Sequence, residues 1–412
     1  MMHEAQQERA MKVQEVILRT LSGQYHWHEA AEILGISERT IFRWKWRYEH
    51  DGYNGLYDRR RQRPSPKRVP AALVQQVLGL HRTRYRGWNV AHFTEQVRTH
   101  HGIRLSYSWI KTALQGAGLV AKRHHRGGHR LRRARRPLSG MLLFQDASTH
   151  AWWPTREGSQ QDLLVILDDA TSEVYDAVFV PQENTESCLA QLRRTVERQG
   201  VFCALYTDRG SHFITTRTGQ SPHQPQTATA LTQIQRALQA LGSQLIPAHS
   251  PQARGRMERL FGTWQGRLPQ ELARRGIRDY AGANRFLRQH WLAYHRRHGG
   301  VPATQRGTAF VPCHRPDLDR IFAVQYERTV ANDNTVQYAR LTLQLAPSAL
   351  RCSFAKCRVI VYEHLDGTLS IGYGPHTLGH YDSHGHALNG NGCAGENNHH
   401  NHRAVTSLAL NN

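Results

Sequence analysis

The chain contains few acidic residues for its length. Its 412 residues include 32 Asp and Glu against 54 Lys and Arg, and the formal net charge is +22. A surplus of this size favours a polyanionic partner, and nucleic acid fits better than a membrane surface because no basic amphipathic anchor stands out. The length is sufficient for roughly two to four domains with cores of their own.

Long apolar runs, a signal peptide and a cysteine framework are also missing. The run Leu163–Leu167 is far too short to span a bilayer, and residues 1–8 lack the basic start and apolar centre of a signal peptide. The six cysteines show no framework spacing; Cys352 and Cys357 could form a metal-binding pair, but no second pair matches them. We therefore expect a cytoplasmic, nucleoid-associated protein with no membrane partner.

Residues 1–57 have the pattern of a helix-turn-helix DNA-binding domain. Gly35 supplies a turn between two short helices, Ser37 is a favourable N-cap, and Ile36 and Ile41 can fill the junction. The second helix carries basic residues suited to the major groove, namely Arg39, Arg43, Lys45 and Arg47. The arrangement resembles the helix-turn-helix of transposases and repressors. The alternative is an ordinary helical hairpin with a solvated basic face.

A second helical unit is predicted over residues 69–121. It looks like another helix-turn-helix, because a Ser cap, a helix and a Gly stop follow one another in 105–119. The basic linker 122–137 follows and includes Arg132 and Arg133. Its like charges repel one another, so we expect the linker to stay unfolded until DNA phosphates neutralise it. A solvated linker with no specific role is the alternative.

Residues 138–300 predict a mixed α/β domain. Three strand-like runs that favour antiparallel pairing are followed by a helix, another strand and further helices, which is the order of a ribonuclease-H-like core. The expected strands are 141–148, 162–168, 173–181 and 201–207, and the expected helices are 184–199, 227–241 and 279–298. The last helix turns basic at its end, so we expect it to pack on the core and present positive charge to DNA.

Three carboxylates of this domain lie in distinctive surroundings. Asp146 is inside one apolar run, Asp208 closes another, and Glu258 lies on a predicted helix, roughly a quarter-turn from the centre of its apolar stripe. A charge within or at the end of a buried strand is costly unless something pairs with it. A divalent metal is the natural partner for three such groups. For Glu258 the alternative is an ion pair with Arg254, four residues earlier.

Other titratable residues of the domain have local explanations. Turn chemistry, a strand start and a helix N-terminus account for the remaining acids, which are Asp168, Asp169, Asp162, Glu183 and Glu186. His212 and His249 flank the acids in sequence and could contact phosphate or transfer a proton, although a structural role is favoured. Gly210 would let the backbone approach a substrate closely, or serve a simple turn.

The three phrases 144–148, 205–213 and 249–263 resemble the integrase catalytic core. They are similar to the DDE transposases of bacterial insertion sequences, with retroviral integrases as distant relatives. The resemblance implies that Asp146 would bridge two Mg²⁺ or Mn²⁺ ions, with Asp208 and Glu258 completing one side each. Such ions, roughly 3.5–4 Å apart, can activate a nucleophile and stabilise a leaving oxygen.

The spacing of the last two acids departs from retroviral-type cores, which have a shorter gap. Fifty positions (258 − 208) separate Asp208 from Glu258. The polar insert around 215–227 would absorb the extra length as a surface loop.

The helix that carries Glu258 is also basic, and we expect DNA phosphates to contact Arg254 and Arg259, with Arg256 a further candidate.

The C-terminal region alternates in strand fashion over about 320–375, with turn signals between the runs. We expect a small β-barrel over 315–376, similar to the C-terminal barrels of transposases, which serves either DNA binding or assembly. Residues 383–412 are rich in Gly, Asn and His and are expected to form a disordered tail.

The sequence as a whole indicates a transposase that binds double-stranded DNA, both element ends and target. The resemblance implies 3′-end nicking followed by strand transfer, and pairing of two ends implies at least a homodimer. A catalytically silent DNA-binding regulator derived from such an enzyme is the alternative. A ribonuclease-H-like nuclease without joining activity would share the three acids but would not require two helix-turn-helix units.

Overall fold

The computed structural model describes residues 4–57, 68–122, 133–154, 158, 160–214, 231–248 and 255–388. The chain divides into two compact units. One contains Met1–Arg86 and Ser108–Ala121, and the other contains Gly87–Tyr107 and Lys122–Asn412. In the described ranges no helix combines the length and the apolarity needed to cross a membrane.

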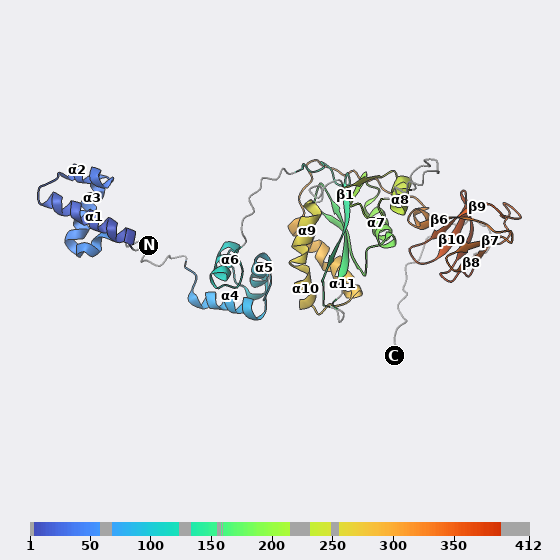
Figure 1. Cartoon of the computed structure of the whole chain (residues 1–412), viewed down its shortest axis with the longest axis horizontal. Coiled ribbons are helices and arrows are strands. Elements are labelled where there is room, and N and C mark those ends of the chain that lie inside the picture. Colours follow the sequence, from blue (N-terminus) through green and yellow to red (C-terminus); the bar gives the residue numbers. More distant parts are fainter. Residues whose placement is uncertain are drawn as a thin grey trace, which may run out of the picture. The chain divides into compact units, whose positions relative to one another are not determined.

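The first unit opens with three helices around a small apolar core (Figure 1). These are α1 (Glu4–Leu21), α2 (Trp27–Leu34) and α3 (Glu38–Asp51), followed by the 3-10 turn η1 (Gly52–Leu56). Gly35 ends α2 in the left-handed conformation with φ 62°, and Ser37 is the N-cap residue of α3. Ile41 is fully buried between the helices. The predicted turn, cap position and junction residue are therefore confirmed, but the Ser37 hydroxyl contacts Thr40 Oγ1 at 2.9 Å and makes no capping hydrogen bond to the backbone.

The predicted second helical unit contains three helices. They are α4 (Ala71–Thr83), α5 (Val90–His101) and α6 (Tyr107–Gly116). Asn89 caps α5 by accepting a hydrogen bond from the His92 backbone N–H. Helix α5 is grouped with the second compact unit, whereas α4 is grouped with the first. The domain boundaries at 69 and 121 remain predictions.

The central domain is built on a five-stranded sheet with the order β3-β2-β1-β4-β5. Antiparallel pairing joins β1 to β2 and β2 to β3, and parallel pairing joins β1 to β4 and β4 to β5. The antiparallel pairing of the first three strands and the order of elements along the chain are those expected from the sequence, whereas β5 lies outside the predicted strands. The strands are β1 (Leu143–His150), β2 (Gln161–Asp168), β3 (Val174–Val180), β4 (Ala204–Thr207) and β5 (Gln244–Pro247).

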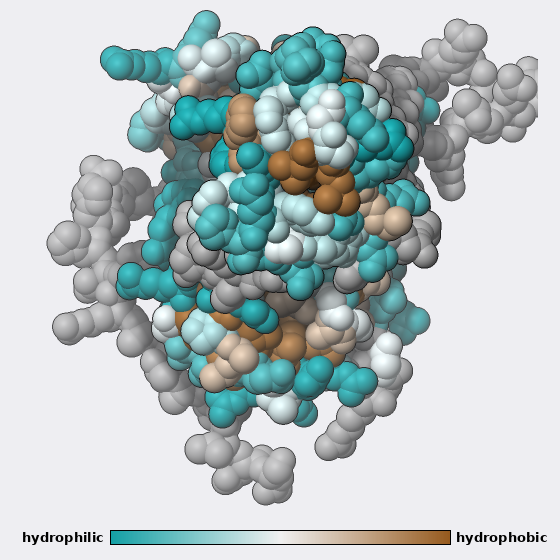
Figure 2. All heavy atoms as spheres, turned by 90° about the vertical axis from the view of Figure 1, so that its left-hand side faces the viewer, coloured by the Kyte–Doolittle hydropathy of each residue, from teal (hydrophilic) through white to brown (hydrophobic). Residues whose placement is uncertain are grey.

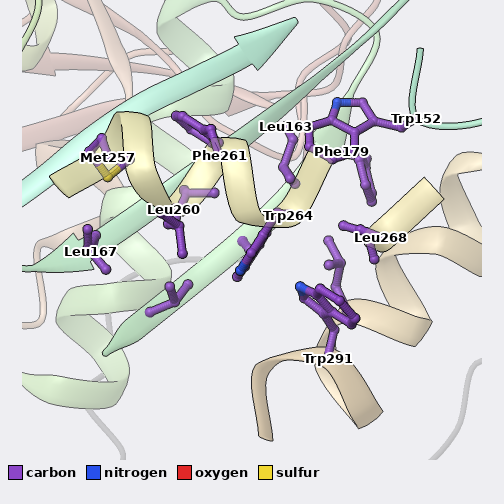
Figure 3. Close-up of a cluster of buried hydrophobic side chains, with 14 of the residues drawn as sticks. Trp152, Leu163, Leu167, Phe179, Met257, Leu260, Phe261, Trp264, Leu268 and Trp291 are labelled. Carbon is purple, nitrogen blue, oxygen red and sulfur yellow. The ribbon is translucent and has the colours of Figure 1, made fainter. Parts of the chain in front are cut away.

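Helices cover both faces of this sheet. Leu143 packs with the core of α7 (Thr185–Gln199) and α8 (Gln233–Leu241), whereas its neighbour Phe144 packs with α9 (Gly255–Gln265). Such alternation follows from the two-residue period of a strand. Figure 3 shows side chains from β2, β3, α9 and α10 meeting in this second cluster.

The α9 face of the sheet is completed by further helices. These are α10 (Leu268–Arg274), α11 (Tyr280–Phe286), the π-helical turn η4 (Leu287–Trp291) and α12 (Leu292–Gly299). The predicted helix 279–298 thus consists of α11, η4 and α12, and its packing on the core is confirmed by buried Phe286, Leu287 and Trp291.

The C-terminal strands do not form the predicted closed barrel. In the described residues, β11-β10-β9-β6 make one four-stranded sheet, and β7-β8 make a separate hairpin. Both contribute to one apolar cluster that contains Val336, Val361 and Ile371. The Tyr381 hydroxyl of β11 donates to the Gln344 carbonyl of β8 at 2.8 Å. This side-chain contact joins two strands that would have to pair through their backbones in a closed barrel. Strand alternation predicts strands but not which edges pair.

These C-terminal elements begin inside the predicted interval 315–376, and the last strand extends beyond it to Tyr381. They are α13 (Leu318–Ile321), β6 (Val324–Thr329), β7 (Thr335–Tyr338), β8 (Leu341–Gln344), β9 (Arg358–Glu363), β10 (Leu369–Tyr373) and β11 (His376–Tyr381). Residues 383–388 of the predicted disordered tail are instead held against β11, where the Leu388 N–H donates to the His380 carbonyl at 2.8 Å. The rest of the predicted tail, from 389 onward, lies outside the described residues. The face of the chain in Figure 2 is largely hydrophilic with small apolar patches, in keeping with the mean hydropathy of −0.62.

Candidate active site

Asp146 and Asp208 lie at the same level of two neighbouring parallel strands. In the pairing of β1 with β4, Leu143 is opposite Leu205 and Phe144 is opposite Tyr206. Continuing this register by two residues places Asp146 opposite Asp208, the first residue after β4. The rings of Phe144 and Tyr206 meet on the α9 face, with centroids 5.4 Å apart. The two aspartates fall on the same face, because side chains alternate along a strand.

Glu258 lies in the first turn of α9, which packs against this same face. The helix buries the predicted apolar stripe against the sheet, shown in Figure 3 as Met257, Leu260, Phe261 and Trp264. Glu258 itself is exposed beside the stripe. The predicted placement of this carboxylate at the margin of a buried helix face is confirmed.

A hydrogen bond between α9 and β1 shows that the side of α9 that carries Glu258 faces strand β1. Gln265 follows Glu258 by seven residues, or about two turns, and therefore shares its flank. Its amide donates to Ser148 Oγ at 3.0 Å. Ser148 follows Asp146 by two residues and lies on the same face of β1. The flank of α9 that carries Glu258 thus lies over the strand face that carries Asp146.

Backbone groups orient the two aspartates. The Ala147 N–H donates to Asp146 Oδ1 at 3.0 Å, and the Gly210 N–H donates to Asp208 Oδ1 at 2.9 Å. Asp146 is 9% exposed. No choice of one carboxylate oxygen from each of the three acids brings all three oxygens within 4.8 Å of one another. The three acids nevertheless offer oxygen ligands from one face of the sheet, and Mg²⁺ and Mn²⁺ prefer such ligands. These ions also retain bound water, which can fill the space between a metal ion and a carboxylate that lies farther away.

A second group of side chains lies next to Asp208. His212 Nε2 is 3.1 Å from Glu183 Oε1, and the Cys188 thiol donates to the same oxygen at 3.6 Å. Burial and the charges of Glu183 and Asp208 raise the pKa of the Cys188 thiol. The contact joins the segment after β4 to the start of α7. Sequence reasoning treated Glu183 and His212 as separate structural residues and missed their pairing, since 29 positions separate them.

Gly210 lies in close contact with two side chains of its own segment. A Cβ atom at this position would lie 2.8 Å from the His212 ring and 3.0 Å from Asp208 Oδ1. Both approaches are shorter than normal contacts, and the second involves a proposed metal ligand. In the structure, the groups that come close to the Gly210 backbone are the side chains of His212 and Asp208.

The competing acids bind protein groups, as expected from their positions. Burial raises the pKa of Asp168, whose carboxylate accepts from the Gly140 and Thr171 backbone N–H groups. Asp162 accepts from Thr149 Oγ1 at 2.6 Å and from the Glu183 N–H at 2.8 Å. These contacts give the buried carboxylates the partners they need.

The described end of the basic linker is fixed to the central domain. The Arg133 guanidinium pairs with buried Asp169, and the Arg136 N–H donates to the other oxygen at 2.7 Å. Arg135 donates to the Asp169 carbonyl at 2.8 Å. Residues 133–136 therefore do not match the expected free, unfolded linker, because a buried carboxylate attracts them. Arg132, His249 and Arg254 lie outside the described residues.

The predicted DNA-contact residues of α3 differ in their surroundings. Arg39 and Arg43 are exposed. Lys45 lies over the Trp27 ring at 5.1 Å and 3.6 Å from Glu49, and Arg47 is half-buried. On the core, Arg259 is exposed and donates to the Gly255 carbonyl of its own helix.

Comparison with known proteins finds family matches in the N-terminal region and sequence relatives over most of the chain. Residues 14–65 match the family described as "Helix-turn-helix domain", and residues 40–114 match "Homeodomain-like domain". The protein named "Putative transposase y4bF" of Sinorhizobium fredii (strain NBRC 101917 / NGR234) is 27% identical over 380 residues, which are 91% of this chain and 81% of the relative.

A second relative is the transposase for insertion sequence IS1202 of Streptococcus pneumoniae. It is 27% identical over 289 residues, or 62% of this chain and 61% of the relative. A solved intasome of simian T-cell lymphotropic virus in complex with PP2A regulatory subunit B56 gamma is 14% identical. The similarity covers 71% of this chain and 91% of that chain, with a TM-score of 0.32. The sequence relatives confirm that the chain resembles transposases of insertion sequences.

Proposed function

We propose that the chain is a DNA transposase of the DDE type, a polynucleotidyl transferase and endonuclease that uses Asp146, Asp208 and Glu258. One observation carries the proposal. The two aspartates lie at one level on neighbouring parallel strands, and the Gln265–Ser148 hydrogen bond holds the flank of α9 that bears Glu258 over the same face. The sequence similarity to two proteins named as transposases supports it.

Asp146, Asp208 and Glu258 would together hold two Mg²⁺ or Mn²⁺ ions through their carboxylate oxygens. When bound, such ions activate an oxygen nucleophile and stabilise the leaving oxygen. The chain's own contribution is positioning. The Ala147 and Gly210 N–H groups orient the aspartates, and the buried stripe of α9 fixes the helix that carries Glu258.

The same site would serve two successive displacements at phosphorus. In nicking, a water oxygen bonds to phosphorus while the 3′-oxygen of the element end leaves and takes up a proton. In strand transfer, that 3′-hydroxyl bonds to a target phosphorus while the target 3′-oxygen leaves. Both steps are in-line, so the site needs no covalent protein intermediate.

Recognition of the element ends would fall to the N-terminal helices. Exposed Arg39 and Arg43 on α3 would reach base edges in the major groove of double-stranded DNA, and Lys45 and Arg47 would contact phosphates. Arg132, Arg133, Arg254 and Arg259 are further proposed phosphate contacts, although Arg133 already pairs with Asp169. Pairing of two ends would require a homodimer or a higher oligomer.

The test is strand transfer with labelled duplexes that carry the ends of the element encoding this chain, a target plasmid and Mg²⁺. Asp208→Ala should abolish joining and leave end binding intact. The matched control is Glu197→Gln, an exposed acid of α7 that pairs with Arg193. Full joining by Asp208→Ala would disprove the catalytic assignment. Specific end binding by the wild-type chain with neither nicking nor joining in Mg²⁺ or Mn²⁺ would instead support the silent regulator.

A further inference from the structure

A pocket of about 510 Å³ opens on the flank of α9 that faces away from Glu258. Arg256, Arg259, Thr263 and Arg267 line it at helical spacing, and their mean direction is roughly half a turn from Glu258. Arg135 contributes from the anchored end of the linker. Four guanidinium groups therefore line this space, and Glu95 of α5 is the one carboxylate among its lining residues.

Beside one end of the pocket, two guanidinium groups pair with a single acid. Arg256 and Arg133 both pair with Asp169, and Arg256 also donates to the Arg133 carbonyl at 2.9 Å. Burial lowers the pKa of Arg256, and the positive charges of Arg133, Arg135 and Arg259 lower it further, against the opposing effect of Asp169. Among the described residues, no carboxylate forms an ion pair with Arg135 or Arg259, so an additional anion would be stabilised here.

Arg259 is the residue best placed to meet such an anion. It is exposed at the pocket, and within the described part of the chain no carboxylate forms an ion pair with it. Its mutation would also leave the contacts around Asp169 in place, because Arg259 does not take part in them. Arg259 therefore reports on ligand binding with little effect on folding.

At the other end of the pocket, Glu95 engages the donors that an anion would use. Its carboxylate accepts from Arg267 Nη1 at 2.7 Å and from Tyr294 Oη at 2.9 Å, and His298 Nε2 lies 3.8 Å away. Burial and the Glu95 hydrogen bond raise the pKa of Tyr294 to about 12, so the phenol remains a donor at neutral pH. A phosphate has the oxygen acceptors to replace this carboxylate.

We propose that this pocket binds the phosphodiester backbone of a DNA strand, with Arg259 contacting a phosphate and Glu95 competing with phosphate for Arg267 and Tyr294. The inference rests on the proposed function, in that DNA is the substrate. The chain's charge of +22 and its helix-turn-helix matches favour DNA over other polyanions. The pocket is separate from the carboxylate face, because it lies on the opposite flank of α9.

The test measures binding of the full chain to a short labelled DNA duplex of unrelated sequence. Fluorescence anisotropy reports the binding, in EDTA and at several salt concentrations. Arg259→Ala should weaken binding about fivefold and reduce the slope of log affinity against log salt by about one. Glu95→Gln should strengthen binding, because it removes a competing charge with no change of shape. The matched control is Arg288→Ala, an exposed arginine of η4 outside the pocket.

Equal losses in Arg259→Ala and Arg288→Ala would overturn the proposal, and so would weaker binding by Glu95→Gln. Arg259→Glu is a second variant, with an expected loss larger than that of Arg259→Ala. The assay contains no divalent metal and no reaction step. If Asp208→Ala retained joining, the catalytic assignment would fail while the pocket result stood; if Arg259→Ala bound DNA normally and Asp208→Ala lost joining, only the pocket would fail.

Discussion

Gln265 on α9 donates a hydrogen bond to Ser148 on β1 at 3.0 Å, and this contact ties the helix of one acid to the strand of another. Both residues are two or more positions from the carboxylates themselves, Ser148 after Asp146 and Gln265 after Glu258. They can therefore be changed without removing a proposed metal ligand. This allows the positioning of the site to be tested separately from its chemistry.

Gln265→Ala should lower the rate of joining by roughly tenfold to a hundredfold, because a displacement of about 1 Å is sufficient for such a loss. Affinity for element ends should change little. The measurement is single-turnover strand transfer beside end binding by anisotropy. Gln289→Ala, an exposed glutamine of η4, is the control. A Gln265→Ala chain that joins at the wild-type rate would show that the tie does not position Glu258.

Gly210→Ala should impair joining while the protein still folds. The added Cβ would meet the His212 ring at 2.8 Å and Asp208 Oδ1 at 3.0 Å, so the His212 ring and the Asp208 carboxylate must move. Gly79→Ala in α4 is the matched control, since nothing lies within 4 Å of its added Cβ. That control should stabilise its helix by about 0.5–1 kcal/mol. Strand transfer and thermal unfolding of both variants check the contrast, and normal joining by Gly210→Ala would contradict it.

Glu271→Gln should destabilise the unit that contains α5 and α10 at neutral pH. Burial raises the pKa of Glu271, but hydrogen bonds from His92 and Arg275 and the charges of Arg274 and Arg275 lower it to about 2, from an ordinary value of 4.5. Because the folded pKa is depressed, the stabilisation is present above pH 4.5 and is lost as the pH falls toward 2. Its size is about 3 kcal/mol.

The check for Glu271 is chemical unfolding of the wild type and Glu271→Gln from pH 7 down to pH 3. The difference in unfolding free energy should shrink across that range. Arg274 and Arg275 are retained in the variant, so the loss reports on the carboxylate. A difference that stays constant with pH would show that packing, and not charge, accounts for the effect.

Mg²⁺ should raise the unfolding temperature of the wild type and not that of Asp146→Asn. Binding to the folded state alone stabilises by about 1.4 kcal/mol at ten times the dissociation constant. Asp146→Asn preserves the shape of a side chain that is only 9% exposed and removes its charge. Chelation by EDTA should reverse the wild-type shift. Equal shifts in both proteins would place the metal elsewhere than at Asp146.

The positions of the acids along the chain could be predicted because each has a strong local signal. Asp146 and Asp208 belong to apolar runs, and Glu258 borders an apolar helical stripe. Their joint placement depends on the parallel pairing of β1 with β4 and on the Gln265–Ser148 contact. Neither has a local signal, because both join segments far apart in the sequence.

The same limit explains what the sequence left out or misjudged. The basic pocket combines Glu95, Arg135, Arg259 and Arg267 from three distant segments, so no window of the sequence contains it. The sequence predicts a free linker because its dense positive charge is visible within a short window. The buried partner Asp169 lies more than thirty residues further along the chain. The predicted barrel failed for a related reason, since closure depends on edge pairing that alternation does not encode.

The two faces of β1 make this strand sensitive to insertions and deletions. Asp146 faces α9, whereas Gln145 donates to the Cys188 carbonyl and to Gln191 on α7. A register slip of one residue would exchange these faces, because the side-chain period is two. It would direct the Asp146 carboxylate into the apolar layer beneath α7 and bring an uncharged side chain to the face that Glu258 borders. The register of one strand therefore decides whether the three proposed metal ligands can share one face of the sheet.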